Sequence, residues 1–161
     1  MKENMDQKIG VYTVIERFLK QGFALMSQTN TSGHVALAFK SQKGDDLTIM
    51  VGYSDAKPSN SSVFGKCLSW ALYAKDEKRE GNIYYVFVYF DKQLLKHRYF
   101  IVPNSEVIAY SRYEHQFWLD SKPSHRDNPF RAFRLGLFYE KYNHKVALVH
   151  EYEDQWDIIK T

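Results

Sequence analysis

The chain has 161 residues, of which 44% are hydrophobic and 25% are charged, a composition typical of one folded domain spanning 1–161. No apolar run approaches the roughly 20 residues that span a bilayer, residues 1–8 lack the apolar stretch of a secretory signal, and the single cysteine, Cys67, excludes a disulfide-stapled scaffold. The net charge of +3 permits a polyanionic partner without requiring one, so we expect a cytoplasmic domain with no membrane partner.

Apolar residues in the first part of the chain follow a helical spacing and then a strand spacing. From Val11 to Leu19 they recur at i, i+3, i+4, i+7 and i+8, which predicts an amphipathic helix that ends before Gly22. Alternating apolar residues then predict three strands, separated by a turn cluster at 29–33 and a hairpin turn at 41–46. These strands are expected at 23–28, 34–40 and 47–53.

The second half of the chain predicts further helices and strands. Ser62 can cap a helix whose buried stripe includes Phe64, Cys67 and Leu72. Asn104 can cap another helix that reaches about residue 119. The other expected elements are a loop at 54–61, a solvated connection at 76–82, strands at 83–90 and 98–102, and an irregular stretch up to a last element at 156–159.

The order of these elements is that of an α/β protein. A helix, three strands, a helix, two strands and a helix indicate a central mixed β-sheet flanked by helices. We expect the core of this single domain at about 8–120 and an irregular C-terminal extension at about 121–161.

The sequence contains none of the common catalytic or metal-binding motifs. A Walker loop, GxGxxG, HExxH, CxxC and GxSxG are all absent. The six histidines have no metal-ligand spacing with a second histidine or a cysteine. The lone Cys67 fits a buried position better than a catalytic thiol. We therefore expect no cofactor and no metal site.

The stretch 110–134 combines cations with aromatic rings. Basic side chains neutralise phosphates and flat rings stack on exposed bases, so the combination indicates a nucleic-acid-binding surface. In the alternative interpretation, the rings anchor a long irregular segment to the sheet and the cations are only its solvated side. The side chains that would contact nucleic acid are Arg112, Lys122, His125, Arg126, Arg131 and Arg134.

The later part of the chain holds four blocks of sequence that follow one another in a characteristic order. They come after a helix, a strand, a Thr31-Ser32-Gly33 entry to a second strand, and a hairpin that returns a third strand. With these blocks the chain resembles, over nearly its whole length, small bacterial proteins of the PD-(D/E)XK, restriction-endonuclease-like class that are grouped near Holliday-junction resolvases. The blocks are Tyr99-Phe100-Ile101-Val102-Pro103, Glu114-His115-Gln116-Phe117-Trp118-Leu119, His125-Arg126-Asp127-Asn128 and Trp156-Asp157-Ile158-Ile159.

The resemblance implies a restriction-endonuclease-like core and a metal-dependent nuclease site on two of its strands. Enzymes of this class bind a divalent metal through an Asp on the second strand and an acid or Gln on the third. A Lys two positions later stabilises the attacking water or the developing charge. At the matching positions this chain has Val35, Met50 and Gly52. None of them supplies an oxygen ligand or an ammonium group, so the resemblance implies a nuclease-like domain that has lost catalysis.

A relocated active site is the alternative. Asp55 and Lys57 have the acid-x-lysine spacing, and Glu16 on the first helix matches an auxiliary acid of such folds. With one acid from Asp45, Asp46 or Glu16, Asp55 and Lys57 would form an active Mg²⁺-dependent nuclease. The third predicted strand separates the two groups of acids, however, at about 3.3 Å per residue.

Three functions are compatible with these observations. We favour a catalytically inactive PD-(D/E)XK nuclease-like domain that binds nucleic acid such as DNA, or a protein such as another nuclease-like subunit. The alternatives are the active nuclease and a protein-interaction or homo-oligomerisation subunit without nucleic-acid binding, which the aromatic content of 16% also suits. Phosphate binding through about five cations would weaken with salt with a log–log slope of magnitude near 4 to 5, whereas an aromatic interface would barely respond.

Overall fold

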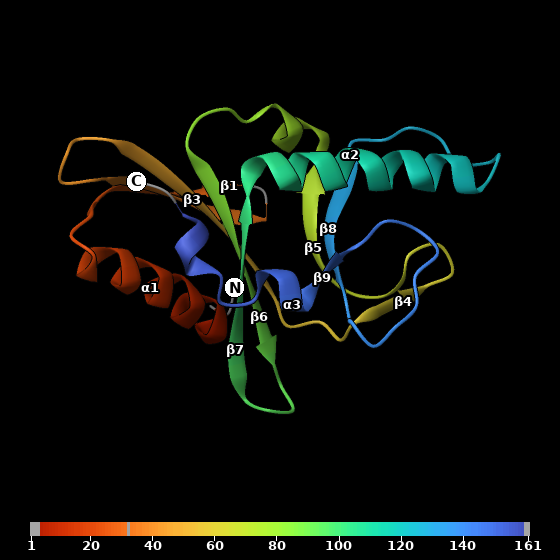
Figure 1. Cartoon of the computed structure of the whole chain (residues 1–161), viewed down its shortest axis with the longest axis horizontal. Coiled ribbons are helices and arrows are strands. Elements are labelled where there is room, and N and C mark those ends of the chain that lie inside the picture. Colours follow the sequence, from red (N-terminus) through yellow and green to blue (C-terminus); the bar gives the residue numbers. More distant parts are fainter. Residues whose placement is uncertain (1–3, 32, 160–161) are drawn as a thin grey trace.

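The computed structural model describes residues 4–31 and 33–159, which form two β-sheets flanked by helices (Figure 1). The larger sheet has five strands in the order β1-β2-β3-β6-β7, and the smaller sheet has four strands in the order β4-β5-β8-β9. Ser32, part of the predicted turn, lies outside the described residues. The prediction of an α/β fold around a mixed sheet is confirmed at this level.

Antiparallel hairpins build the first half of the larger sheet. β1 (Ala24–Thr31), β2 (His34–Lys40) and β3 (Asp46–Ser54) pair in chain order, close to the three predicted strands. β3 then pairs in parallel with β6 (Ile83–Asp91), and β6 pairs antiparallel with β7 (Lys96–Pro103). A parallel pair requires a crossover connection, and strands of the smaller sheet form it here.

α1 (Met5–Lys20) covers one face of the larger sheet. Its N-terminus is capped by Asn4, whose side chain accepts a backbone hydrogen bond from the first turn. Phe18 is buried against the sheet, whereas Leu19, predicted on the same apolar face, is 48% exposed. The chain leaves the helix at Gly22, whose φ of +91° is the left-handed conformation that glycine adopts without strain. The predicted helix is confirmed.

β5 (Gly65–Tyr73) is a strand where the sequence predicted a helix, so that prediction was wrong. Leu68 and Leu72 fit both a helical stripe and a strand alternation, and the apolar Cys67 and Ala71 on the other face of the strand make the two patterns hard to separate in the sequence. The position of Trp70 distinguishes the strand from the helix. Trp70 lies on the same buried face as the two leucines, while Cys67 is buried on the opposite face.

Three further strands complete the smaller sheet. β4 (Ser59–Ser61) and β8 (Phe130–Gly136) flank β5 in antiparallel pairs, and β9 (Ala147–Leu148) runs parallel to β8. β8 and β9 lie in the stretch that was predicted to be an irregular extension, so that prediction is corrected. Phe133 and Leu135 of β8 are fully buried, which makes this stretch part of the core.

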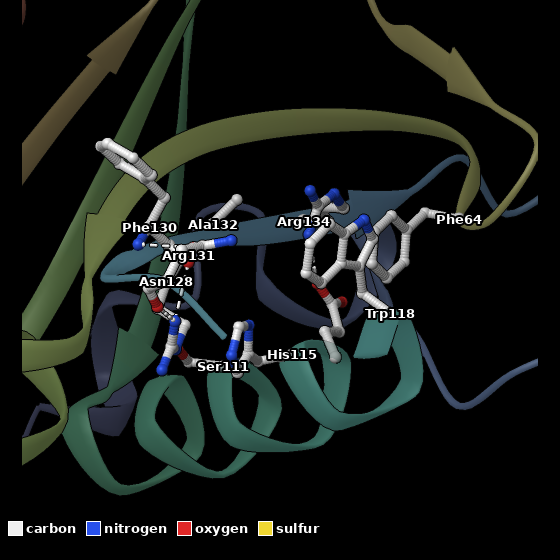
Figure 2. Close-up of a pocket in the computed structure, with 10 residues that line it drawn as sticks. Phe64, Ser111, His115, Trp118, Asn128, Phe130, Arg131, Ala132 and Arg134 are labelled. Atoms are coloured by element: carbon white, nitrogen blue, oxygen red, sulfur yellow. Dashed lines mark hydrogen bonds and ion pairs between the residues drawn. The ribbon is translucent and has the colours of Figure 1, made fainter. Parts of the chain in front are cut away.

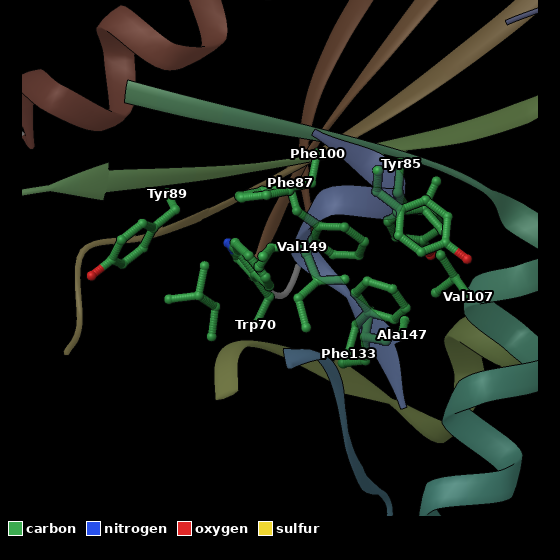
Figure 3. Close-up of a cluster of buried hydrophobic side chains, with 14 of the residues drawn as sticks. Trp70, Tyr85, Phe87, Tyr89, Phe100, Val107, Phe133, Ala147 and Val149 are labelled. Atoms are coloured by element: carbon green, nitrogen blue, oxygen red, sulfur yellow. The ribbon is translucent and has the colours of Figure 1, made fainter. Parts of the chain in front are cut away.

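Two buried clusters lie on the two faces of the larger sheet. One is enclosed by α1, and the other is enclosed by the smaller sheet with α2 (Figure 3). In the second cluster, Phe87 of β6 stacks on Phe133 of β8 with ring centroids 4.6 Å apart. The indole N–H of Trp70 also donates a hydrogen bond of 3.0 Å to the carbonyl oxygen of Val88 in β6. The smaller sheet is therefore packed directly onto the larger one.

α2 (Asn104–Ser121) confirms the predicted helix and packs against β8. The sequence predicted that Asn104 caps this helix, and that prediction was wrong. Pro103 holds the N-cap position, and the Asn104 side chain donates a hydrogen bond of 3.0 Å to the carbonyl oxygen of Arg79. In the described part of the chain, no helix has the combination of length and apolar character that crossing a bilayer requires.

The connection at 76–82 is exposed over most of its length, as predicted, but its start is anchored to the fold, which the sequence did not predict. It begins inside the short helix η1 (Ala74–Lys78), where Asp76 is buried. The Asp76 carboxylate accepts hydrogen bonds from the backbone N–H of Tyr73 at 2.8 Å and from the Arg79 guanidinium at 3.0 and 3.2 Å. These bonds fix the end of β5 beside α2.

The C-terminal residues close one edge of the larger sheet. Beside the short elements α3 (Val149–Tyr152) and η2 (Trp156–Ile158), Glu153 forms an isolated antiparallel bridge with Phe100 of β7. The Arg98 guanidinium also holds the Glu153 carboxylate, with bonds of 2.6 and 3.0 Å. The opposite edge differs, since the strand pairing of β1 in the described residues is with β2 alone.

Candidate functional site

The three positions matched to nuclease residues lie in the apolar centre of the larger sheet. Val35 is 8% exposed and belongs to the cluster under α1, whereas Met50 is 1% exposed and belongs to the cluster on the opposite face. At Gly52, an added Cβ atom would lie 3.2 Å from the rings of His34 and Phe87, so a longer side chain would have to displace them. These positions therefore do not converge on one polar pocket.

Glu16, the auxiliary acid of the alternative nuclease site, is on the solvent side of α1. It forms an exposed ion pair with Lys20 at 2.7 Å, and the hydrogen bond from this lysine lowers the pKa of the Glu16 carboxyl. Within residues 4–31 and 33–159, no group of three or more His, Cys, Asp or Glu side chains is placed to hold a metal ion. The structure does not bring Glu16 together with the other acids of that site.

Asp55 and Lys57 lie in the loop that follows β3. The Asp55 carboxylate is 3.4 Å from the ammonium group of Lys92, and Lys57 is exposed. Asp46 is at the other end of β3, where it pairs with Lys40 at 3.2 Å. The acids of the alternative nuclease site thus stand at opposite ends of a nine-residue strand.

A cleft of about 200 Å³ opens between the C-terminal half of α2 and β8, and we call it the α2–β8 cleft (Figure 2). Side chains spaced three or four residues apart on α2 face β8, whose alternate residues point back towards the helix. A second hollow of about 320 Å³ adjoins the cleft beside β4. The α2–β8 cleft is lined mainly by Phe64, Glu114, His115, Trp118, Arg131 and Arg134.

The floor of the cleft holds a buried ion pair. Glu114 is only 2% exposed, and its Oε2 atom accepts a hydrogen bond of 2.9 Å from Nη1 of Arg134. Its Oε1 atom is also buried and has no hydrogen-bond partner in the described residues. Burial raises the pKa of Glu114 to about 7, although the Arg134 guanidinium acts in the opposite direction. Arg134 lies over the ring of Phe64, 3.8 Å from its centroid.

A second carboxylate, that of Glu77, binds three side chains at one end of the cleft. Its Oε1 atom accepts hydrogen bonds of 3.0 Å from Arg131 Nε and from Ser111 Oγ. Arg112 approaches the other oxygen at 3.4 Å. Arg131 additionally donates to the carbonyl oxygen of Asn128 at 2.6 Å. The Arg131 charge is therefore largely balanced by Glu77, while the Arg112 side chain is 64% exposed.

Three flat side chains stack along the outer half of α2. The rings of Trp118 and His125 lie 3.9 Å apart at 8°, and the ring of His115 lies 6.0 Å from Trp118 at 19°. The His115 Nε2 atom is 2.7 Å from Asp127, and this hydrogen bond lowers the pKa of the Asp127 carboxyl. Although Ser111, His115 and Asp127 are near one another, Ser111 donates to Glu77, so they do not form a nucleophile–base pair.

The structure places the six predicted nucleic-acid contacts on α2, β8 and the loop between them. Arg131 and Arg134 line the α2–β8 cleft, and the His125 ring stacks on the Trp118 ring. Lys122 follows the last residue of α2, and Arg126 donates a hydrogen bond of 2.8 Å to the carbonyl oxygen of Pro123. The two arginines of β8 pair with carboxylates, Arg134 with the buried Glu114 and Arg131 with the partly exposed Glu77, and the sequence did not reveal these pairs.

The sequence placed Glu114, His115 and Trp118 in the stretch 110–134 but did not single them out as residues of one site. A detectable signal was their spacing on α2, because positions 111, 115 and 118 and positions 114 and 118 fall on one helical face. Phe64 could not be found in this way, because it belongs to a distant segment that was predicted to be a helix. The cleft thus brings together the Trp118 ring, the Arg134 guanidinium and the Glu114 carboxyl group, whose buried Oε1 atom has no hydrogen-bond partner in the described residues. Comparison of the chain with protein-family models, with curated proteins and with solved structures found no match.

Proposed function

We propose that this protein is a non-catalytic binding module for single-stranded nucleic acid and that the α2–β8 cleft receives an exposed base. The observation that carries the proposal is the combination of the Trp118 ring with the Arg134 guanidinium, which lies over the buried Phe64 ring, in one cleft. Bases stack on aromatic side chains and on guanidinium planes, and only unpaired bases expose their faces. A cleft of about 200 Å³ is also too small for a duplex and suits one flat ring.

Three exposed cations on α2 and in the loop after it are available to the phosphate backbone. Arg112, Lys122 and Arg126 are exposed, and two of them lie at the end of α2 nearest to Trp118. Because Arg131 and Arg134 are balanced by Glu77 and Glu114, we count three cations rather than five as available to phosphates. Three contacts with a single strand give a log–log salt slope of magnitude about 2.

A protein partner is the second candidate, and the exposure of three aromatic side chains favours it. Phe130 at the start of β8, and Phe138 and Tyr139 in the loop after β8, are each about two-thirds exposed. Aromatic side chains are enriched at protein interfaces. A protein complex held by these rings would change little with added salt, which separates this candidate from nucleic-acid binding.

The proposal is tested by fluorescence anisotropy with a labelled mixed-sequence 12-mer, single-stranded in one arm and duplex in the other. We expect the single strand to bind more tightly, and we expect Trp118→Leu to weaken that binding about tenfold or more because a stacking surface is lost. Tyr12→Leu on α1, an exposed ring remote in sequence, is the matched control and should leave binding unchanged. Absence of single-strand binding at low salt, or a Trp118→Leu variant that folds and binds normally, would overturn the proposal.

A further inference from the structure

We infer that the Glu114–Arg134 pair reads the edge of the bound base and selects guanine. This inference rests on the proposed function, because it names the base that the α2–β8 cleft takes. It follows from one juxtaposition, a buried acceptor without a partner beside a guanidinium with unused donors, both lining the cleft that Trp118 borders.

Glu114 supplies the acceptor. Its Oε2 atom is committed to Arg134 at 2.9 Å, which fixes the orientation of the carboxyl group. Glu114 lines the cleft, and its Oε1 atom is buried and accepts no hydrogen bond in the described residues. Leaving a buried acceptor unsatisfied costs free energy, and a ligand with an N–H group at this point would recover that loss.

Arg134 supplies the donors. A guanidinium carries five N–H groups, and within the described residues Arg134 uses one of them, in the bond to Glu114. The ring of Phe64 covers one face of the guanidinium and holds its plane in place. The remaining N–H groups can therefore donate to an acceptor that lies next to the N–H group bound by Glu114.

Guanine presents the pattern that this pair requires. Its Watson–Crick edge carries the N1–H and N2–H groups side by side, followed by the O6 acceptor. A carboxylate can accept from the two N–H groups while the guanidinium donates to O6. Adenine and cytosine each offer one amino group there beside a ring-nitrogen acceptor, and uracil and thymine offer one N–H between two carbonyl groups. Guanine alone offers two adjacent donors next to an acceptor.

The position of Trp118 brings a base edge to this pair. Glu114 and Trp118 are four residues apart on α2 and thus on the same face of the helix. His125 already covers one face of the indole, at 3.9 Å. A base that stacks on the indole inside the α2–β8 cleft lies one helical turn from Glu114, within the distance that a purine ring spans.

The experiment compares four oligothymidylate 12-mers that carry a single central G, A, C or T, by fluorescence anisotropy at fixed salt. We expect the G strand to bind about tenfold or more tightly than the T strand, the discrimination of one bidentate base contact. In Glu114→Gln the ratio of G-strand to T-strand affinity should fall below about threefold. Glu106→Gln, an exposed carboxylate on the same helix, is the matched control and should keep the preference.

A ligand-side substitution tests the same contact without a variant protein. Inosine lacks the N2 amino group of guanine, so a central inosine should lose most of the G preference if Glu114 accepts from that group. Equal binding of all four strands, with the dependence on Trp118 preserved, would overturn the inference and leave the proposed function standing. Absence of binding to every strand would overturn the proposed function itself.

Free nucleotides distinguish a base in a strand from a soluble guanine nucleotide. Isothermal titration with GMP, AMP, CMP and UMP should show weak heat for GMP alone, because the strand adds contacts from Arg112, Lys122 and Arg126. Tighter binding of GMP than of the G strand would assign the cleft to a free nucleotide and overturn single-strand binding. Equal heats for the four nucleotides would overturn the selection of guanine.

Discussion

The centre of the larger sheet and the α2–β8 cleft differ in what they bury. The sheet centre, where the resemblance places a nuclease site, holds Val35, Met50 and Gly52 between two apolar clusters. The cleft holds Glu114 paired with Arg134 beside an open space of about 200 Å³. Buried charges are costly to maintain, whereas apolar residues stabilise a core directly. We conclude that the residues of the cleft are the candidates for ligand binding, and that the residues of the sheet centre contribute to the stability of the fold.

The largest effect is expected from placing an acid in the sheet centre. Met50→Asp puts a charge without a partner among the aromatic side chains of the smaller-sheet cluster, and we expect a loss of about 5 kcal/mol in the free energy of unfolding. Met50→Leu keeps the volume and should cost less than about 1.5 kcal/mol. Urea denaturation measures both. A stable Met50→Asp variant that binds Mg²⁺ would contradict the conclusion that the sheet centre serves stability alone.

The next largest effect concerns the ion pair of the cleft. Arg134→Met leaves the Glu114 carboxylate buried and unpaired, so at pH 8 we expect a loss of about 4 kcal/mol. The double variant Glu114→Gln/Arg134→Met removes the charge as well and should recover most of this loss. Urea denaturation of the two single variants and the double variant gives the coupling free energy. Additive effects of the two substitutions would contradict the pairing.

The pH dependence of stability should distinguish the cleft from the sheet centre. The folded-state pKa of Glu114 is raised from 4.5 to about 7, so the folded protein binds more protons than the unfolded chain between these values. The associated stability is fully present below pH 4.5 and is lost as the pH rises through about 7, by at most about 3 kcal/mol. Denaturation at pH 5 and pH 8 should show this loss in the natural protein and not in Glu114→Gln. An identical pH profile in both proteins would refute it.

The smallest effect is expected at the alternative nuclease residues. Asp55 forms only a partly exposed ion pair with Lys92, so Asp55→Ala and Lys57→Ala should change stability by less than about 0.5 kcal/mol. Neither substitution should change nucleic-acid binding. Incubation of the natural protein with duplex, single-stranded and branched DNA and Mg²⁺ or Mn²⁺ completes the test. Cleavage that is abolished by Asp55→Ala would restore the active-nuclease alternative.

The sequence predicted the larger sheet well because its strands and its helix follow simple periods. The alternation in residues 34–40 and 47–53 gave β2 and β3, and the stripe from Val11 to Phe18 gave α1. The smaller sheet was not predictable in the same way. In β5, the apolar Cys67 and Ala71 on the less buried face hide the alternation in the sequence. In β8, Phe130 and Phe133 are each followed by an arginine, a spacing that does not alternate, and this stretch was predicted to be irregular.

Only part of the candidate site could be predicted from the sequence. The cations and rings of 110–134 were identified as a set, and the structure places Arg131, Arg134 and Trp118 in one cleft. The neutralisation of these arginines depends on Glu77 and Glu114, and Glu77 is 54 residues from Arg131 in the chain. Pairing over such a separation follows from the tertiary fold and not from local pattern. The resemblance to nuclease-like proteins stays a prediction.

The unequal edges of the larger sheet limit how copies of this chain could associate through strands. The β7 side is occupied by the bridge between Phe100 and Glu153, while β1 is free to pair along its outer side. Two chains that joined antiparallel through β1 would meet at a twofold axis and consume both available edges. Growth through this edge would end with a pair, because the contact uses β1 of both partners and leaves no β1 edge for a third chain.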